Sequence, residues 1–273
     1  MNLKDLHYTG GISAEGRGLL RRLARTGSIF SVDEAATILA LSPRRAVRLL
    51  AHWCEKGWLA RLRQGLYAVV PLESDPRTAR VADPWVLLSR VFSPCYVGGW
   101  SACEHWELTE QLFRTIVIIT TRRVRSKTGD LAGFPYLAKR IGPRRLFGTR
   151  RVWRGQTPVD VSDPHRTIVD VLDDPAIGGG IRHVAGVLSA YFRSEHRSEQ
   201  QLIRYAEKLG NRTVFKRLGF LIERLGIEAP AAVAACLTSL SSGYSRLEPS
   251  GPQKGKLLRR WRLLVNVQIR PPE

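Results

Sequence analysis

Arginines at positions 44, 45 and 48, followed one turn later by His52, have the side-chain type and spacing to bind a polyanion. A guanidinium group presents a planar fork of N–H donors that matches the two acceptors on the major-groove edge of guanine. Residues three and four positions apart share one face of a helix, so these four side chains would lie together. The pattern predicts a nucleic-acid-contacting helix over Pro43–Lys56, in which Arg45 and Arg48 lie early enough to reach base edges.

The elements around this helix are those of a winged helix-turn-helix. The sequence predicts a helix over Ser13–Thr26, a second helix after the capping box Ser31–Glu34, a turn at Leu41–Pro43, and two strands, Trp58–Arg63 and Leu66–Val70, around the tight turn Gln64–Gly65. In this motif the helix after the turn enters the major groove. Arg61 and Arg63 on the hairpin would then contact phosphate or the minor groove. A solvated basic face without a partner, and a winged helix used for dimerisation, stay open as alternatives.

The chain as a whole is strongly basic, with 43 Lys and Arg residues against 24 Asp and Glu residues, a net charge of +19 in 273 residues. This balance points to a polyanionic partner, either nucleic acid, an anionic membrane or an acidic protein surface. The excess divides as +4 over residues 1–75, +8 over 76–170 and +7 over 171–273. A single basic tail therefore does not carry it.

Membrane insertion and secretion are not predicted. The longest run without a charged residue, Ala229–Ser245, contains Pro230 and several serines, and it is shorter than the about 20 apolar residues that a spanning helix needs. The first residues, MNLKDLHYTGG, lack the order of a signal peptide. Four scattered cysteines without a C-x-x-C pair are typical of reduced thiols. We therefore expect a soluble cytoplasmic protein that does not bind membranes.

The predicted fold class is α+β, with the winged helix-turn-helix in residues 1–75 and a larger domain in residues 76–273. That domain is predicted to be mixed α/β over residues 76–175 and mainly helical over 176–273. Pro71–Pro84 predicts a linker because it is rich in proline and charge. Further elements are predicted as helices at Trp85–Phe92, Ile168–Leu172, Ile181–Tyr191, Ser198–Leu209, Thr213–Leu225 and Ala229–Leu240, and as strands at Thr115–Thr121, Phe134–Arg140, Arg150–Trp153 and Val159–Val161.

The helix predicted at Thr213–Leu225 is amphipathic. One side carries an apolar stripe that predicts contact with the core. The stripe is backed by the basic residues Arg212, Lys216, Arg217 and Arg224. The basic face is interpreted as able to meet an acidic partner.

Candidate catalytic and metal-binding residues form no recognised pattern. His105, His165 and His183, with Glu104, Asp163 and Asp170, match none of the helical spacings that bind zinc. Asp163 is interpreted as the cap of a helix that begins at Pro164, and Asp170 as a surface position. Gly178–Gly180 is not followed by the Gly-Lys-Ser/Thr of a phosphate-binding loop, and Ser101 lacks the context of a catalytic nucleophile. We expect no metal, no cofactor and no enzymatic activity.

Several segments resemble the AbiEi-type antitoxins of AbiE-like, type IV toxin–antitoxin systems. The resemblance covers about residues 13 to 268 and is carried by "RQGLY" in the hairpin, "YVGGWSACEHWELTEQ", "VSDPHRTIVDVLDDP" followed by "GGG", and "LEPSGPQKGKLLRRWRLLVN". The middle and C-terminal strings are fairly specific, whereas the winged helix alone is not. One departure is Glu107, where the family commonly has Gly in a "GLTEQ"-like string.

The resemblance implies a transcriptional autoregulator that binds inverted repeats in the double-stranded DNA of its own promoter. It also implies that the rest of the chain neutralises a cognate toxin of the nucleotidyltransferase-like superfamily, as in abortive infection. The first alternative is a winged-helix regulator of other genes without a toxin partner, and the second is a winged-helix nuclease. The basic run Arg122, Arg123, Arg125 and Lys127 is expected in a loop or hairpin tip just after the strand Thr115–Thr121. It has two interpretations, a solvated strand end or a contact with phosphate or toxin.

Overall fold

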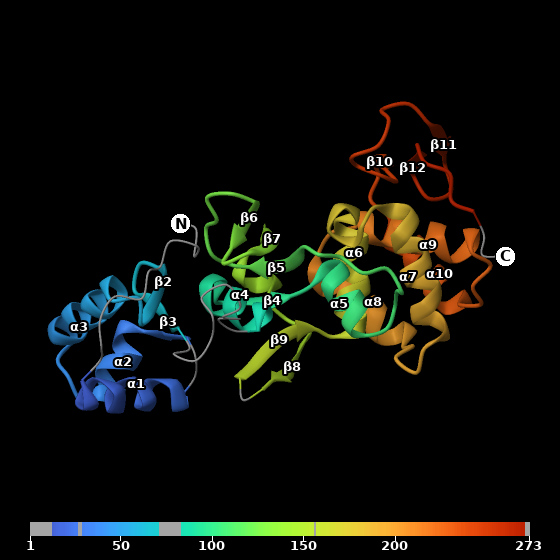
Figure 1. Ribbon diagram of the computed structural model, residues 1–273. Helices are drawn as coiled ribbons and strands as arrows, with labels where there is room; N and C mark the ends of the chain where they lie inside the picture. The colour runs from blue at the N-terminus through green and yellow to red at the C-terminus, as the bar shows by residue number, and fades with distance from the viewer. Residues whose placement is uncertain (1–12, 27–28, 71–82, 156, 271–273) are drawn as a thin grey trace. The chain divides into compact units, whose positions relative to one another are not determined.

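A computed structural model describes residues 13–26, 29–70, 83–155 and 157–270. Within these residues the protein is mixed α and β, with ten α-helices and three sheets (Figure 1). The chain forms two compact units. Unit 1 contains the described residues up to Ser93 together with those in 129–135 and 152–159, and unit 2 contains the other described residues from Pro94 onward. The predicted domain boundary between residues 75 and 76 lies outside the described residues and stays a prediction.

Unit 1 begins with elements in the order that fits a winged helix. They are α1 (Ala14–Thr26), β1 (Ile29–Ser31), α2 (Val32–Leu39), α3 (Pro43–Glu55), β2 (Leu59–Arg63) and β3 (Leu66–Val69). The strands form an antiparallel sheet of order β1-β3-β2, in which Phe30 pairs with Tyr67 and Ala60 with Ala68. The short strand β1 was not predicted, because three residues are too few for a visible alternation of apolar and polar side chains.

The predicted linker Pro71–Pro84 falls mostly outside the described residues. Its last two residues start α4 (Pro84–Phe92), where the Asp83 carboxylate accepts hydrogen bonds from the N–H groups of Trp85 and Val86 at 2.8 and 3.3 Å. Pro84 occupies the first helical position, where its missing N–H costs nothing. The helix predicted at Trp85–Phe92 is therefore confirmed.

A mixed six-stranded sheet follows. Its strands are β4 (Cys95–Val97), β5 (Ile116–Thr120), β6 (Thr128–Leu131), β7 (Phe134–Arg140), β8 (Thr149–Arg154) and β9 (Thr157–Ser162), in the order β6-β7-β5-β4-β9-β8. The central strand β5 is buried along its whole length, as its β-branched sequence predicts. The helix α5 (Gly99–His105) connects β4 to the segment before β5, and its Trp100 and Cys103 are buried.

Helices dominate the rest of unit 2. They are α6 (Pro164–Asp173), α7 (Ile181–Arg193), α8 (Glu199–Leu209), α9 (Thr213–Arg224) and α10 (Pro230–Thr238), followed by a small sheet of β10 (Ser245–Arg246), β11 (Lys256–Leu258) and β12 (Leu263–Val265). Figure 1 shows this small sheet standing on the helical part of the unit. The helices share one large core with Trp261, which has no exposed surface. None of the helices in the described part of the chain has the length and apolar character to cross a membrane.

Candidate nucleic-acid interface

Local sequence signals fix the start of α2 and the turn before α3. The Ser31 N–H donates to Glu34 Oε2 at 2.7 Å, and the Glu34 N–H donates to Ser31 Oγ at 3.1 Å, so the predicted capping box is confirmed. Ala40 ends α2 in the left-handed conformation with φ of 55°. Pro43 begins α3 after Ser42, whose side chain makes no capping hydrogen bond. The end of α2 at Ala40 and the start of α3 at Pro43 together set the direction of α3 after the turn.

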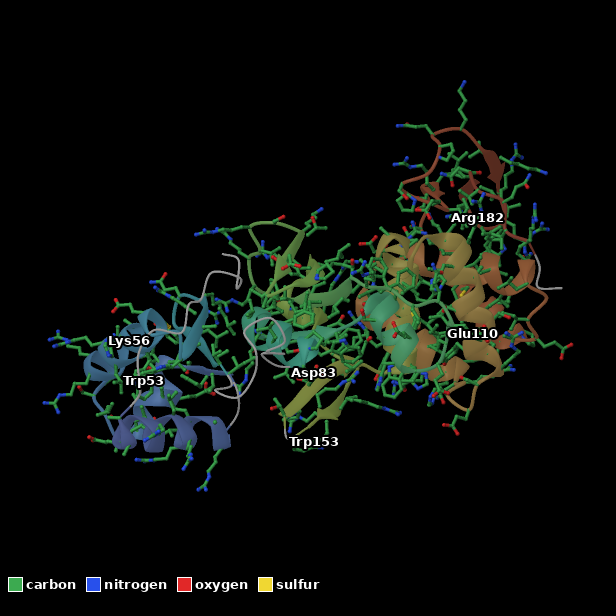
Figure 2. The ribbon with its side chains drawn as sticks, in the orientation of Figure 1. Trp53, Lys56, Asp83, Glu110, Trp153 and Arg182 are labelled. Carbon is green, nitrogen blue, oxygen red and sulfur yellow. The ribbon has the colours of Figure 1, made fainter. Side chains whose placement is uncertain are left out.

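The helix α3 is held by one apolar side. Ala46, Leu50 and Trp53 are buried at the spacing of one helical face. Leu50 and Trp53 pack in the core of unit 1 with Leu23 and Phe30, and Trp53 is marked in Figure 2. Because this contact fixes the rotation of α3 about its axis, it also determines which side chains face solvent.

The opposite side of α3 presents the predicted basic residues. Arg44, Arg45, Arg48 and His52 are all exposed. Among the described residues, none of the three arginines forms an ion pair. The His52 ring lies edge-on to Trp58 with 6.4 Å between ring centroids. The structure therefore brings all four side chains to one face, and their contact with bases stays a prediction.

The hairpin places its two arginines differently. Arg61 is exposed, whereas Arg63 is half-buried and its Nη1 donates to the Gln64 carbonyl oxygen at 3.3 Å. Gly65 adopts φ of 75°, which allows the tight turn between β2 and β3. The pairing register of β2 with β3 shifts between Arg61 and Arg63, where the strand is irregular. Arg61 is the hairpin residue that is free to extend toward a phosphate.

The second predicted basic group lies in unit 2, in the loop after β5. Arg122, Arg123, Arg125 and Lys127 are exposed there. The loop is not a hairpin tip, because β7 lies between β5 and β6 in the sheet. Its ends are anchored: the Arg122 N–H donates to Thr120 Oγ1 at 3.0 Å, and the Ala138 N–H donates to the Lys127 carbonyl oxygen at 2.6 Å. The position of these four residues does not decide between a solvated strand end and a contact with phosphate or toxin.

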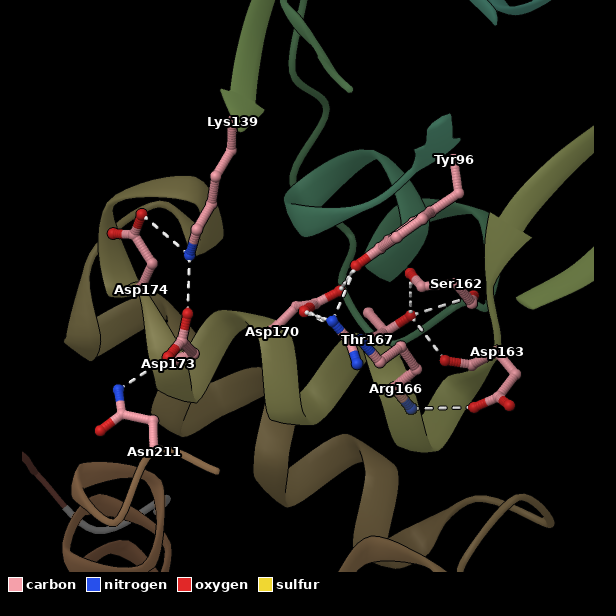
Figure 3. A network of polar contacts seen from close by, with 10 residues as sticks. All are labelled: Tyr96, Lys139, Ser162, Asp163, Arg166, Thr167, Asp170, Asp173, Asp174 and Asn211. Atoms are coloured by element: carbon pink, nitrogen blue, oxygen red, sulfur yellow. Dashed lines mark hydrogen bonds and ion pairs between the residues drawn. The ribbon is translucent and has the colours of Figure 1, made fainter. Parts of the chain in front are cut away.

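Asp170 was predicted at the surface, and this is wrong: it is 3% exposed and lies in a buried network (Figure 3). Tyr96 Oη donates to Asp170 Oδ2 at 2.9 Å. Arg166, with no exposed surface, donates from Nε to Asp170 Oδ1 and from Nη2 to Tyr96 Oη, both at 3.0 Å, and Nη2 also forms an ion pair with Asp170 Oδ1 at 3.0 Å. Burial raises the pKa of Asp170, and the Arg166 guanidinium opposes that rise. The network connects β4 to α6. The prediction of a surface position for Asp170 was wrong because the sheet covers this face of α6.

The other groups considered for chemistry also have structural partners. Asp163 caps α6 as predicted, because its Oδ1 accepts the Arg166 N–H at 2.8 Å. His165 Nδ1 lies 2.8 Å from Tyr191 Oη, and burial lowers the pKa of His165. His183 lies between Thr109 Oγ1 and the Gly178 carbonyl oxygen, at 2.8 and 2.6 Å from its two ring nitrogens. Within the described ranges, no three His, Cys, Asp or Glu side chains converge as metal ligands would.

The basic side of α9 was predicted to be available to a partner, and for two of its residues this is wrong. Arg217 is 4% exposed and Lys216 is 1% exposed. The Arg217 guanidinium donates to the carbonyl oxygens of Leu172, Asp173, Arg246 and Leu247 at 2.7 to 3.1 Å. Lys216 Nζ donates to the Gly243 carbonyl oxygen and to Ser245 Oγ. A signal for Arg217 was present in the sequence, because it lies three residues after Val214 and four before Leu221, on the edge of the apolar stripe.

Comparison with known proteins supports the winged-helix part of this description. Residues 19–70 match the family model described as "Transcriptional regulator, AbiEi antitoxin", which confirms the resemblance over α1 to β3 and suggests a transcriptional regulator or antitoxin. The chain is also similar in structure to the crystal structure of the RV2827C protein from Mycobacterium tuberculosis. The two are 18% identical, with a TM-score of 0.65 over 95% of this chain and 94% of that chain, so the likeness shows the fold. No curated protein matches the chain in sequence.

Proposed function

We propose that this protein is a cytoplasmic, DNA-binding antitoxin that represses its own toxin–antitoxin operon and neutralises a nucleotidyltransferase-like toxin. The observation that carries the DNA-binding part is the exposed arginine face of α3, which forms no ion pair with any residue that the structure describes. It lies within the residues that match the AbiEi regulator model. A helix that follows the turn of this motif reads the major groove through its first turns. Arg45 and Arg48 are proposed to contact bases, with Arg44, His52, Arg61 and Arg63 on phosphates or at the groove edges.

The toxin-directed part of the proposal rests on the resemblance of the middle and C-terminal segments, together with the position of the charge. Residues 1–75 hold +4 of the net charge of +19, so most of the excess lies beyond the winged helix. A polyanionic contact of the later segments is therefore proposed in addition to the DNA contact. Arg122, Arg123, Arg125 and Lys127 are proposed to take part in it, toward phosphate or toxin.

DNA binding is tested by titrating the full chain against a duplex that carries its own promoter, with fluorescence anisotropy as the readout. Arg45→Ala and Arg48→Ala are each expected to cost about 1 to 3 kcal/mol and to relax base preference, because a bidentate contact is lost. Arg21→Ala on α1 is the matched control, since Arg21 is also exposed but lies on another helix. Equal affinity of all three variants and the wild type would contradict the assignment of α3 as the recognition helix.

Antitoxin function is tested by co-expression with the product of the neighbouring open reading frame, which the proposal expects to be nucleotidyltransferase-like. The wild type is expected to restore growth. A variant with Arg44, Arg45 and Arg48 all changed to Ala is expected to restore growth equally under a heterologous promoter, while it no longer binds the operator. Failure of the wild type to restore growth would favour the alternative of a regulator without a toxin partner.

A further inference from the structure

One side of α7 carries only small side chains. Ala185 and Gly186 lie one turn before Ser189, so the three residues share a face of the helix. Ala185 and Ser189 are buried, with 4% and 8% of their surface exposed. A Cβ on Gly186 would meet no atom within 4 Å. The space beside Gly186 is therefore open.

A cavity of about 570 Å³ lies beside this face of α7, within unit 2. Leu225, which follows α9, and residues 268–270 of the C-terminal segment form its other walls. The segment is anchored, because Ile269 packs in the large core and its carbonyl oxygen accepts a hydrogen bond from Arg224 Nε at 3.0 Å. The volume is in the range of pockets that hold small organic ligands, about 300 to 1,000 Å³.

The lining of this cavity is cationic. It includes the exposed residues Arg182, which begins α7 and is labelled in Figure 2, and Arg270 on the C-terminal segment. None of the described residues that line it is acidic, and neither arginine forms an ion pair within the described part of the chain. Arg182 Nε donates to the Gln268 carbonyl oxygen at 3.4 Å, which leaves its two Nη groups for another acceptor. Two cations without a neighbouring acid favour an anionic ligand.

Ser189 provides a second, independent indication of a ligand. This residue lines the cavity, is more than nine-tenths buried, and forms no hydrogen bond through Oγ with any residue that the structure describes. Most buried polar side chains in proteins have a hydrogen-bond partner, because burial of a hydroxyl group without one costs free energy. A polar ligand in the cavity would supply the partner that Ser189 lacks.

We propose that this cavity binds a nucleotide, either free or at the 5′ end of a nucleic-acid strand. Arg182 and Arg270 bind its phosphate, because the planar guanidinium fork matches the geometry of phosphate oxygens. Leu225 and Ile269 cover the apolar faces of its base, for which inorganic phosphate has no counterpart. The inference goes beyond the proposed function and does not depend on it, since no residue of the cavity belongs to the winged helix.

The test is isothermal titration calorimetry of the full chain with each of the four ribonucleoside 5′-monophosphates. At least one of them is expected to bind about tenfold more tightly than its nucleoside and than inorganic phosphate, because each of these compounds lacks half of the contacts. A short oligonucleotide with and without a 5′ phosphate distinguishes the two sources of the nucleotide. A gain in affinity from the 5′ phosphate assigns the site to strand ends, and the absence of a gain assigns it to free nucleotides.

Variants locate the site on α7. Arg182→Gln is expected to weaken nucleotide binding about tenfold. Arg193→Gln, in the exposed last turn of the same helix, is the matched control and is expected to leave the affinity unchanged. Gly186→Phe is expected to abolish binding because the ring fills the cavity, whereas Gly186→Ala is expected to keep it. Ser189→Ala is expected to weaken binding about fivefold without lowering the melting temperature, because Oγ has no protein partner to lose. A merely structural serine would not show this combination.

Nucleotide binding that is weakened in Arg182→Gln and Ser189→Ala, but kept in Arg193→Gln and Gly186→Ala, supports the site. If Gly186→Phe does not fold, these four variants decide the question without it. The inference is overturned if no nucleotide binds at millimolar concentration, or if inorganic phosphate binds as tightly as the nucleotides do. An equal loss of affinity in Arg182→Gln and Arg193→Gln also overturns it, in favour of diffuse attraction to a basic protein. Each of these outcomes leaves the proposed antitoxin function unaffected.

Discussion

The helices α3 and α9 have similar charge patterns and opposite environments. Each combines an apolar stripe with a cluster of basic residues. In α3 the cluster faces solvent, and Arg44, Arg45 and Arg48 have no ion pair among the described residues. In α9 every residue from Val214 to Ile222 is buried, including Lys216 and Arg217. Basic side chains are therefore exposed to solvent on α3, whereas on α9 two of them are buried and have a structural role.

The difference arises from what packs on the second side of each helix. The side of α9 away from the other helices is covered by the C-terminal segment. There Ser245 Oγ accepts a hydrogen bond from Lys216, and the carbonyl oxygens of Arg246 and Leu247 accept from Arg217. A buried guanidinium is tolerated there because four carbonyl oxygens accept its N–H groups. The lesson is that a basic helix face predicts a binding surface only when no distant segment covers it.

The largest expected effect is the loss of stability when Arg217 is removed. Arg217→Met is expected to destabilise the protein by about 3 to 4 kcal/mol, because four carbonyl oxygens, two of them in buried contacts, lose their donor. Arg48→Met on α3 is the matched change, and it is expected to shift stability by less than about 0.5 kcal/mol because Arg48 is exposed. Urea unfolding of the full chain, followed by far-UV circular dichroism, measures both values.

This pair of variants tests directly whether the basic residues of α3 and α9 have different roles. Equal stability of Arg217→Met and Arg48→Met would mean that the hydrogen bonds of Arg217 contribute nothing net. The burial of charge on α9 would then have no structural role.

A smaller effect is expected at Gly219, on the side of α9 that meets Trp261. A Cβ at this position would lie 2.0 Å from Trp261 Cη2, and the indole has no exposed surface into which it could move. Gly219→Ala is therefore expected to destabilise by about 2 kcal/mol through overpacking. Gly18→Ala, at an exposed position of α1 in unit 1, meets no atom within 4 Å and is expected to stabilise by about 0.5 to 1 kcal/mol through helix propensity.

Thermal melts of the two glycine variants measure these opposite shifts. A gain of stability in Gly219→Ala would show that the tight contact with Trp261 relaxes without cost, and that α9 is less closely covered than its burial indicates.

The sequence predicted best where the determinants are local. The capping box of Ser31 and Glu34, the cap at Asp163 and the strand around Ile116–Thr120 each depend on a few neighbouring residues, and all three are confirmed. Asp170 and Lys216 were misplaced because their burial depends on Tyr96 and Gly243, which lie 74 and 27 residues away in the chain. The basic face of α3 could be predicted as a surface, but the contact with DNA proposed for it depends on a partner that is not encoded in the spacing of its arginines.

The smallest expected effect concerns how the helices end. After α3 and α9 the chain turns through glycines in the left-handed conformation, Gly57 with φ of 76° and Gly226 with φ of 64°. After α5 the same conformation is adopted by Glu107, with φ of 56°, at the position where the resemblance to AbiEi-type antitoxins places Gly. A side chain with a Cβ is strained there, whereas glycine is not.

Glu107→Gly is therefore expected to stabilise the protein by about 0.5 to 1 kcal/mol, despite the greater freedom of glycine in the unfolded chain. Gly226→Ala, which places a Cβ in the same conformation at the end of α9, is expected to destabilise by a similar amount. Both shifts are measured by the midpoint of thermal unfolding. A loss of stability in Glu107→Gly would mean that the exposed Glu107 side chain makes a contribution that outweighs its backbone strain, and that the ends of α5 and α9 are not equivalent.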